Sequence, residues 1–219
     1  MIQAVIFDMD GLLVDSEPWW RVAETNVFGQ LSRAPGEADF ERMMGNRIQE
    51  VIKQWYQRHP WENADFETVQ DRIIGEVDRL VKENTGLLPG VGNCIRFFEE
   101  RKIPVALASS SPYRLIESLM RHYGLYDRFS LVCSAENEPF GKPHPAVFLT
   151  AAHNMQTDPL HTLVFEDSFN GVIAAKAARM KCVAVPAAEA QGQTRFDAAD
   201  LKLRSLEDWD ELSWKKLSS

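Results

Sequence analysis

The stretch that decides the fold is AVIFDMDG, residues 4–11. Its first four residues are apolar, and a short apolar run of this kind is typical of a strand buried on both faces of a sheet. Asp8 and Asp10 follow, and Gly11 allows a sharp turn or a close approach to a ligand. Two acids at the end of a buried strand repel each other and are costly to desolvate, which favours a bound cation. The alternative is a surface turn, where Asp and Gly are common.

Length and composition limit the class of protein. The 219 residues suffice for one large domain or for a core with a smaller domain, and 45% of them are hydrophobic, enough for a substantial core. The net charge of −8 disfavours a nucleic-acid binder or a membrane-surface protein, because these present a basic face. No apolar stretch has the length of a membrane span, and no basic segment precedes the first one. We expect a soluble, cytoplasmic monomer with no nucleic-acid or membrane partner.

The three cysteines do not indicate a disulfide framework. Cys94, Cys133 and Cys182 are widely separated, and their number is odd. We expect buried free thiols in a reducing compartment.

Residues 15–87 indicate helices only. Apolar residues recur with helical spacing over 48–56 and 69–81. Ser16 is a candidate N-cap for the first helix, and Pro18 fits its first turn. This region is predicted to be a small helical insert after the first strand.

From residue 88 onward, strand-like and helix-like segments alternate. The expected strands are 103–108, 130–133, 162–165 and 182–185, and the expected helices are 91–101, 112–123, 145–154 and 168–180. Such alternation predicts an α/β fold, a doubly wound, Rossmann-like parallel sheet with helices on both faces. Residues 1–14 and 88–219 would form this core domain. The tail after Pro186 has no clear pattern.

Polar residues follow each expected strand, and in open α/β sheets the carboxyl ends of the strands form the ligand crevice. Besides Asp8 and Asp10, these residues are Ser109-Ser110-Ser111, Lys142 and Glu166-Asp167. Each group alone is explained by helix capping or by a solvated charge. Together, four acids in one crevice require a cation, and oxygen ligands without His or Cys indicate Mg²⁺. A site with Mg²⁺, a lysine and hydroxyl groups suits a phosphate group.

The set Asp8-Met9-Asp10-Gly11, Ser109, Lys142-Pro143 and Glu166-Asp167 resembles the four motifs of the haloacid dehalogenase-like superfamily. The resemblance covers essentially the whole chain, and the helical insert is similar to the C1-type cap of that superfamily. The similarity is greatest to the branch that holds β-phosphoglucomutase and bacterial phosphatases of 2-deoxyglucose 6-phosphate and hexitol phosphates. It implies a Mg²⁺-dependent phosphatase that acts on a small phosphorylated sugar or polyol.

The resemblance also implies a role for each motif residue. Asp8 would attack phosphorus and form an aspartyl-phosphate, and Asp10 would act as general acid and then general base. Asp8, Asp167 and the backbone carbonyl of Asp10 would bind Mg²⁺, with Glu166 as a ligand directly or through water. The phosphoryl oxygens would be bound by the hydroxyl cluster and the lysine, through Ser109, Ser110 and Lys142.

Two other functions stay open. One is a phosphosugar mutase of the β-phosphoglucomutase type, although Trp20 stands where such mutases carry a cap histidine. The other is a non-catalytic phosphometabolite-binding protein, which the intact motif set disfavours. Dehalogenase and phosphonatase activity are disfavoured by Asp10. Trp19 and Trp20 are expected to form an apolar wall over a sugar.

The cap is expected to choose the substrate. Gly45-Asn46-Arg47 resembles the cap loop of the family, in which the arginine reaches substrate oxygens. The alternative is a helix start with Asn46 as N-cap and Arg47 in solvent. Trp55 and Trp61 are expected to be packing residues.

Overall fold

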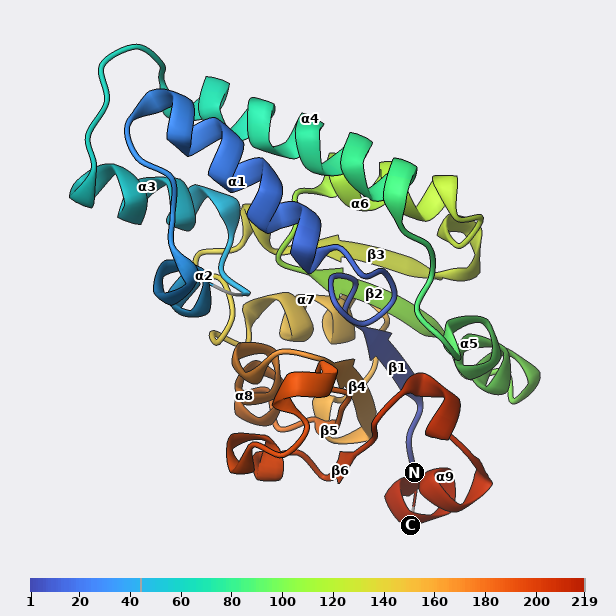
Figure 1. Ribbon diagram of the computed structural model, residues 1–219. Coiled ribbons are helices and arrows are strands. Elements are labelled where there is room, and N and C mark those ends of the chain that lie inside the picture. The colour runs from blue at the N-terminus through green and yellow to red at the C-terminus, as the bar shows by residue number, and fades with distance from the viewer. Residues whose placement is uncertain (44, 219) are drawn as a thin grey trace.

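The apolar run at the N-terminus forms β1 (Ala4–Phe7), which lies in the middle of a parallel sheet (Figure 1). In the computed structural model, which describes residues 1–43 and 45–218, this sheet has six strands in the order β3-β2-β1-β4-β5-β6. Val5 of β1 pairs with Val105 of β2 and with Leu163 of β4. The other strands are β2 (Val105–Ser109), β3 (Leu131–Ser134), β4 (Thr162–Glu166), β5 (Lys181–Ala184) and β6 (Leu201–Lys202). The doubly wound parallel sheet predicted from the sequence is confirmed.

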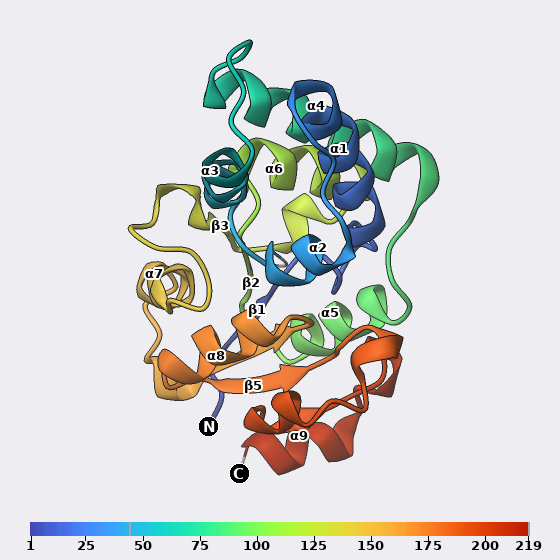
Figure 2. The same ribbon diagram turned by 60° about the vertical axis from the view of Figure 1, so that its left-hand side comes forward.

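Successive strand residues face two different apolar layers. Val5 and Phe7 belong to the layer with α5, α6 and α9, whereas Ile6 belongs to the layer with α7 and α8. Figure 2 shows α8 and α9 on opposite sides of β5. Burial on both faces explains why β1 is an uninterrupted apolar run. These helices are α5 (Val91–Glu100), α6 (Tyr113–His122), α7 (Ala146–Asn154), α8 (Phe169–Ala177) and α9 (Glu211–Ser218).

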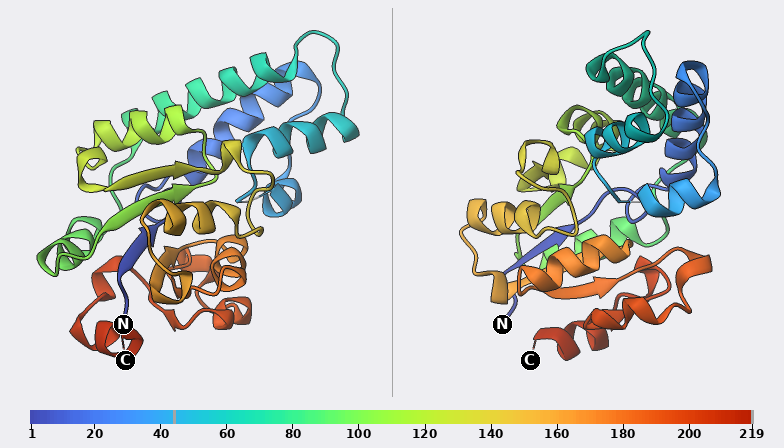
Figure 3. Two further views of the ribbon diagram at one scale, coloured as in Figure 1. Left: turned by 180° about the vertical axis from the view of Figure 1, so that it is seen from behind. Right: turned by 90° about the vertical axis from the view of Figure 1, so that its left-hand side faces the viewer.

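Four helices lie between β1 and α5 in the sequence and form a cap over the carboxyl ends of the strands (Figures 1 and 3). They are α1 (Glu17–Leu31), α2 (Glu37–Met43), α3 (Ile48–Arg58) and α4 (Phe66–Asn84). Phe28 lies in the centre of the cap, with its ring centroid 5.8 Å from that of Trp55 and 6.1 Å from that of Trp61. The expected helical insert after the first strand is confirmed, and both tryptophans pack in its interior.

The two chain segments that join the cap to the sheet run side by side. Val14 forms an antiparallel bridge with Leu87, and the Leu88 N–H donates to the Leu13 carbonyl at 2.9 Å. The entry and exit of the cap are therefore held together. Figure 3 shows both chain termini at the end of the molecule farthest from the cap.

The tail after Pro186 contains elements that hydrophobic periodicity did not indicate. The two-residue strand β6 extends the sheet beside β5, and Trp214 of α9 packs edge-on against Phe97 and Phe98 of α5. Two residues are too few to show a period, and a helix with a few large apolar contacts shows only a weak one.

All three cysteines are free and buried, as expected, and burial raises the pKa of each thiol. Within the part of the chain that the structure describes, no helix has both the length and the apolar character needed to cross a bilayer.

Gly90 is required by the contact between α5 and the tail. Its φ is +85°, and a Cβ there would lie 2.2 Å from the Glu207 backbone nitrogen. We expect Gly90→Ala to lower the free energy of unfolding by about 2–4 kcal/mol, because backbone must move. Gly75, exposed in α4 with no atom near its Cβ position, is the control, and Gly75→Ala should raise stability by about 0.5–1 kcal/mol. Urea unfolding measures both, and equal effects would contradict this role for Gly90.

Candidate active site

Two strand ends bring three carboxylates together. Asp8 follows β1, Glu166 ends β4 and Asp167 comes next, and each offers an oxygen within 4.8 Å of the others. Glycines leave the necessary space, since a Cβ on Gly11 would lie 2.3 Å from Asp167 Oδ2 and one on Gly171 would lie 1.7 Å from Glu166 Oε1. The structure thus brings Asp8 together with the acid pair Glu166-Asp167, which the sequence places after a different strand.

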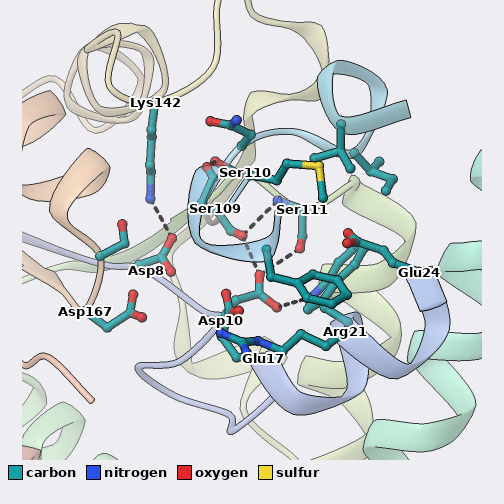
Figure 4. A pocket seen from close by; sticks show the side chains of 18 of the residues that line it. Asp8, Asp10, Glu17, Arg21, Glu24, Ser109, Ser110, Ser111, Lys142 and Asp167 are labelled. Atoms are coloured by element: carbon teal, nitrogen blue, oxygen red, sulfur yellow. Dashed lines mark hydrogen bonds and ion pairs between the residues drawn. The ribbon is translucent and has the colours of Figure 1, made fainter. Parts of the chain in front are cut away.

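Lys142 lies inside this cluster. Its Nζ donates to Asp8 Oδ1 and to Glu166 Oε1, both at 2.6 Å, and the three side chains are buried (Figure 4). Burial alone would lower the pKa of Lys142, but the charges of Asp8 and Glu166 and the hydrogen bonds to them outweigh it and raise that pKa. Lys142 is therefore a charged group that offsets part of the carboxylate repulsion.

One lysine does not balance three buried acids. Burial raises the pKa of Asp8 to about 8, with the charges of Glu166 and Asp10 adding to it and Lys142 opposing it. Burial and the charges of Glu166 and Asp8 also raise the pKa of Asp167 well above its ordinary value. A bound cation would favour the ionised forms of both. Asp8, Glu166 and Asp167 could hold a metal ion, and an all-oxygen ligand set suits a hard divalent cation.

Asp10 lies in a different environment from Asp8. Its carboxylate accepts four hydrogen bonds, two to each oxygen, and it does not belong to the acidic cluster. The donors are Ser16 Oγ at 2.7 Å, Trp20 Nε1 at 3.0 Å, Ser109 Oγ at 3.1 Å and Ser111 Oγ at 2.7 Å. The first two come from the cap side of the chain and the last two from the sheet, so Asp10 is a point where cap and core meet.

Two expectations about the start of the cap hold only in part. Ser16 stands at the N-cap position of α1, but its hydroxyl makes no cap hydrogen bond and donates to Asp10 instead. Trp20 lines the cavity and also binds Asp10, whereas Trp19 is not in the cavity wall and packs against the apolar core.

The serines at the end of β2 all lie in the cavity wall. Ser109 and Ser111 contact Asp10, and Ser110 Oγ donates to the Gly45 carbonyl of the cap loop at 3.1 Å. The cavity wall therefore contains the predicted acids, serines and lysine, with the cap loop above them.

Arg47 is the predicted site residue that the structure leaves outside the cavity wall. Its side chain is 12% exposed, so it is not in solvent either. Its guanidinium donates to the carbonyls of Ala135 and Glu138 on the core, at 3.1 and 2.6 Å, and pairs with Glu50. Arg47 itself stands at the N-cap position of α3, one residue later than the helix start considered with Asn46. In this arrangement Arg47 links the cap to the core.

Three charged residues of α1 were not predicted from the sequence. Glu17, Arg21 and Glu24 line the cavity together with Trp20, as Figure 4 shows for the labelled charged groups. Their spacing of four and three residues places them on one helix face. Spacings of three and four residues from Trp20 would have indicated Glu17 and Glu24, but not the adjacent Arg21.

The two glutamates of this face are buried acids. Burial raises the pKa of Glu17 to about 7, with a further contribution from the charge of Asp10. Burial raises the pKa of Glu24 to about 8, with Glu17 adding to it and Arg21 opposing it. The end of the cavity under α1 therefore carries two carboxyl groups and the Arg21 guanidinium.

Comparisons with known proteins identify the family of this chain. The family model described as haloacid dehalogenase-like hydrolase matches residues 2–179. Hexitol phosphatase B of Escherichia coli (strain K12) is 44% identical over 206 residues, 94% of this chain and 93% of that protein. The phosphorylated carbohydrates phosphatase of Thermotoga maritima is 31% identical over 177 residues, 81% of this chain and 82% of that protein.

The crystal structure of CbbY from Rhodobacter sphaeroides in complex with phosphate has the same fold. It matches with a TM-score of 0.89 and 23% identity, over 100% of both chains. The chain belongs to the haloacid dehalogenase-like hydrolase family, and it is a hydrolase.

The burial of Glu24 predicts a pH-dependent difference in stability. Its pKa is about 8 in the folded protein against an ordinary value of 4.5, so the unfolded chain releases this proton first as pH rises. The contribution of Glu24 to the free energy of unfolding therefore falls between these two values. Glu24→Gln has no such loss, and its unfolding temperature relative to wild type should rise by several degrees from about pH 5 to about pH 8. Exposed Glu62→Gln is the control, and a pH-independent difference for Glu24→Gln would contradict the prediction.

Proposed function

We propose that this chain is a Mg²⁺-dependent phosphatase that hydrolyses small sugar or sugar-alcohol phosphates, such as hexitol phosphates or 2-deoxyglucose 6-phosphate, through an aspartyl-phosphate on Asp8. The observation that carries the proposal is the position of Asp8 in the cavity wall, 2.6 Å from the buried Lys142 and inside the carboxylate cluster. An ionised carboxylate beside a fixed cation is suited to attack a phosphate that the same cation attracts.

The carboxylate cluster is the proposed Mg²⁺ site. Asp8 and Asp167 would bind the ion by their side chains and Asp10 by its backbone carbonyl, with Glu166 completing the set directly or through water. Both oxygens of Glu166 already accept protein hydrogen bonds, from Lys142 and from Ser168, which favours the arrangement through water. The ion supplies positive charge that offsets the charge of the phosphate group.

The chemistry itself assigns different tasks to the two aspartates. Asp8 attacks phosphorus as the ester P–O bond breaks, and protonated Asp10 gives its proton to the leaving alkoxide. In the second step Asp10 takes a proton from the attacking water, the P–O bond to Asp8 breaks, and inorganic phosphate leaves. Four hydrogen-bond donors orient Asp10 for this work. Ser109, Ser110 and Lys142 would bind the phosphoryl oxygens, which requires Ser110 to exchange its bond with Gly45.

Residues 15–87 would act as a cap domain that covers the substrate on a core of residues 1–14 and 88–219. The paired segments at Val14 and Leu87 fit a hinge, and the bonds of Arg47 to the core loop fit a contact that forms when the cap is closed. Direct contact between Arg47 and substrate would require those bonds to break.

The relatives support the substrate class. Hexitol phosphatase B and the phosphorylated carbohydrates phosphatase are both named for phosphorylated carbohydrates or polyols, and they span most of this chain. A phosphosugar mutase is the alternative, but Trp20 occupies the position at which such mutases carry histidine, and an indole does not transfer protons to a substrate. We further propose a cytoplasmic monomer that binds neither nucleic acid nor membrane.

Replacing the nucleophile tests the mechanism. Asp8→Asn should reduce phosphate release from sorbitol 6-phosphate by at least about a thousandfold, because the amide is not a nucleophile. Removal of one buried charge should leave the fold intact, as circular dichroism would show. Asp127→Asn, at an exposed position, is the matched control. Activity retained in Asp8→Asn would contradict the mechanism.

A substrate panel separates the alternatives. Sugar and polyol phosphates with Mg²⁺ should release inorganic phosphate, and a chelator should stop the release. Conversion between isomers without phosphate release would indicate the mutase. Absence of turnover across the panel would favour the phosphometabolite-binding protein.

The indole donor to Asp10 can be removed separately. Trp20→Phe keeps an aromatic ring in the wall but loses the Nε1–H bond to Asp10, so kcat should fall by about tenfold, the value of one hydrogen bond to a charged group. Trp19→Phe, one position earlier and outside the cavity wall, should leave kcat unchanged. Equal kcat values for the two variants would show that the indole does not help to orient Asp10.

A further inference from the structure

Glu24 has no function in the mechanism above, yet its position is unusual. The residue is 7% exposed, it stands on α1 beside the buried Ala23, and its side chain lines the cavity. No group in residues 1–43 or 45–218 forms a hydrogen bond or ion pair with its carboxyl group. Its oxygens are not among the buried polar atoms that lack a partner, so they are open to the cavity, where a ligand can reach them. A carboxyl group on a residue this buried is unusual without a protein partner, because desolvation disfavours its charged form.

Glu24 lies at the end of the cavity away from the residues proposed to act on the phosphate group. Figure 4 shows Glu24 on the opposite side of the cavity from Asp8 and Lys142, with Asp10 between them. A substrate whose phosphate lies beside Asp8 and whose ester oxygen lies near Asp10 therefore extends its remaining atoms toward Glu24.

We propose that Glu24 is a specificity-determining residue, whose carboxyl group binds hydroxyl groups of the substrate at the end of the cavity away from the transferred phosphate. This inference rests on the proposed phosphatase function. A hydroxyl group both donates and accepts hydrogen bonds, so it satisfies the carboxyl group in either protonation state. The binding of a polyol thus supplies the partner that the protein does not.

The charges around Glu24 select against other substituents. Glu17 lies on the same helix face and, with Glu24, disfavours a second phosphate at this end of the cavity. Arg21 is also in the wall and adds a positive charge, while its guanidinium is paired with Glu37 at 2.6 Å. That cation disfavours an amino group. Neutral hydroxyl groups are repelled neither by the carboxyl groups of Glu17 and Glu24 nor by the guanidinium of Arg21.

The test compares phosphate monoesters that carry different groups away from the transferred phosphate, and it reads the change in each ratio between wild type and variant. Sorbitol 6-phosphate carries hydroxyl groups, phenyl phosphate carries none, fructose 1,6-bisphosphate adds a phosphate, and glucosamine 6-phosphate adds an amine. Each is assayed for kcat and KM with wild type and with Glu24→Leu, Glu24→Met and Glu24→Gln. Two apolar variants are used so that the test still stands if one of them fails to fold. Glu62→Leu, at an exposed position, is the matched control.

In the apolar variants the ratio of kcat/KM for sorbitol 6-phosphate to that for phenyl phosphate should fall by about tenfold or more, mainly through KM, because hydrogen bonds to the substrate are lost. Glu24→Gln should recover most of this ratio. Relative activity toward the bisphosphate should rise in the apolar variants as repulsion is removed.

An unchanged ratio in Glu24→Leu and Glu24→Met would overturn the proposal while leaving the phosphatase function intact. A wild-type preference for glucosamine 6-phosphate that is lost in Glu24→Gln would also overturn it, because Glu24 would then bind a cation. If wild type releases phosphate from none of the four compounds, the phosphatase function itself fails, and the role of Glu24 fails with it.

Discussion

The crowding of carboxylates around Lys142 constrains the rest of the structure. Two acids 4 Å apart repel each other by about 4 kcal/mol at an effective dielectric of about 20, and Asp8, Glu166 and Asp167 are all buried or nearly so. They stay together because Lys142 reaches both Asp8 and Glu166 and because Gly11 and the α8 backbone at Gly171 approach closely. The six-stranded sheet places the three acids at the carboxyl ends of its central strands β1 and β4. A divalent cation bound there would complete the charge balance.

The cap adds a second, different electrostatic environment. Asp10 is only two residues from Asp8, but its carboxylate is held by hydroxyl and indole donors from both cap and core. This difference in surroundings fits the proposed roles of Asp8 as nucleophile and Asp10 as proton carrier. The α1 helix that supplies Trp20 also carries Glu17, Arg21 and Glu24. One helix therefore both holds the Asp10 carboxylate and forms the wall that would contact the sugar or polyol in the proposed function.

Much of this could be predicted from local sequence signals. The apolar runs of β1 and β4 are continuous because both faces are buried, and acids directly after such runs are conspicuous. Contacts between distant segments left no local signal: the Ser16 hydroxyl suits a helix cap equally well, and Arg47 binds carbonyls 88 and 91 residues further along the chain. Glu24 was missed for another reason, since a charged residue in a helix is usually on a solvated face and its burial depends on the packing of the cap. The short strand β6 has too few residues for any period to show.

In the proposed function, the buried carboxylate cluster is a cation site on which the chemistry depends. Calorimetric titration of the protein with Mg²⁺, together with its unfolding temperature, tests this directly in wild type and in Asp167→Asn. Wild type should bind one ion and unfold at a higher temperature when Mg²⁺ is present. Asp167→Asn should be the more stable protein without Mg²⁺, because one buried acid is gone, and should lose the response to the ion. Equal Mg²⁺ binding by the two proteins, or no binding by wild type, would contradict the account.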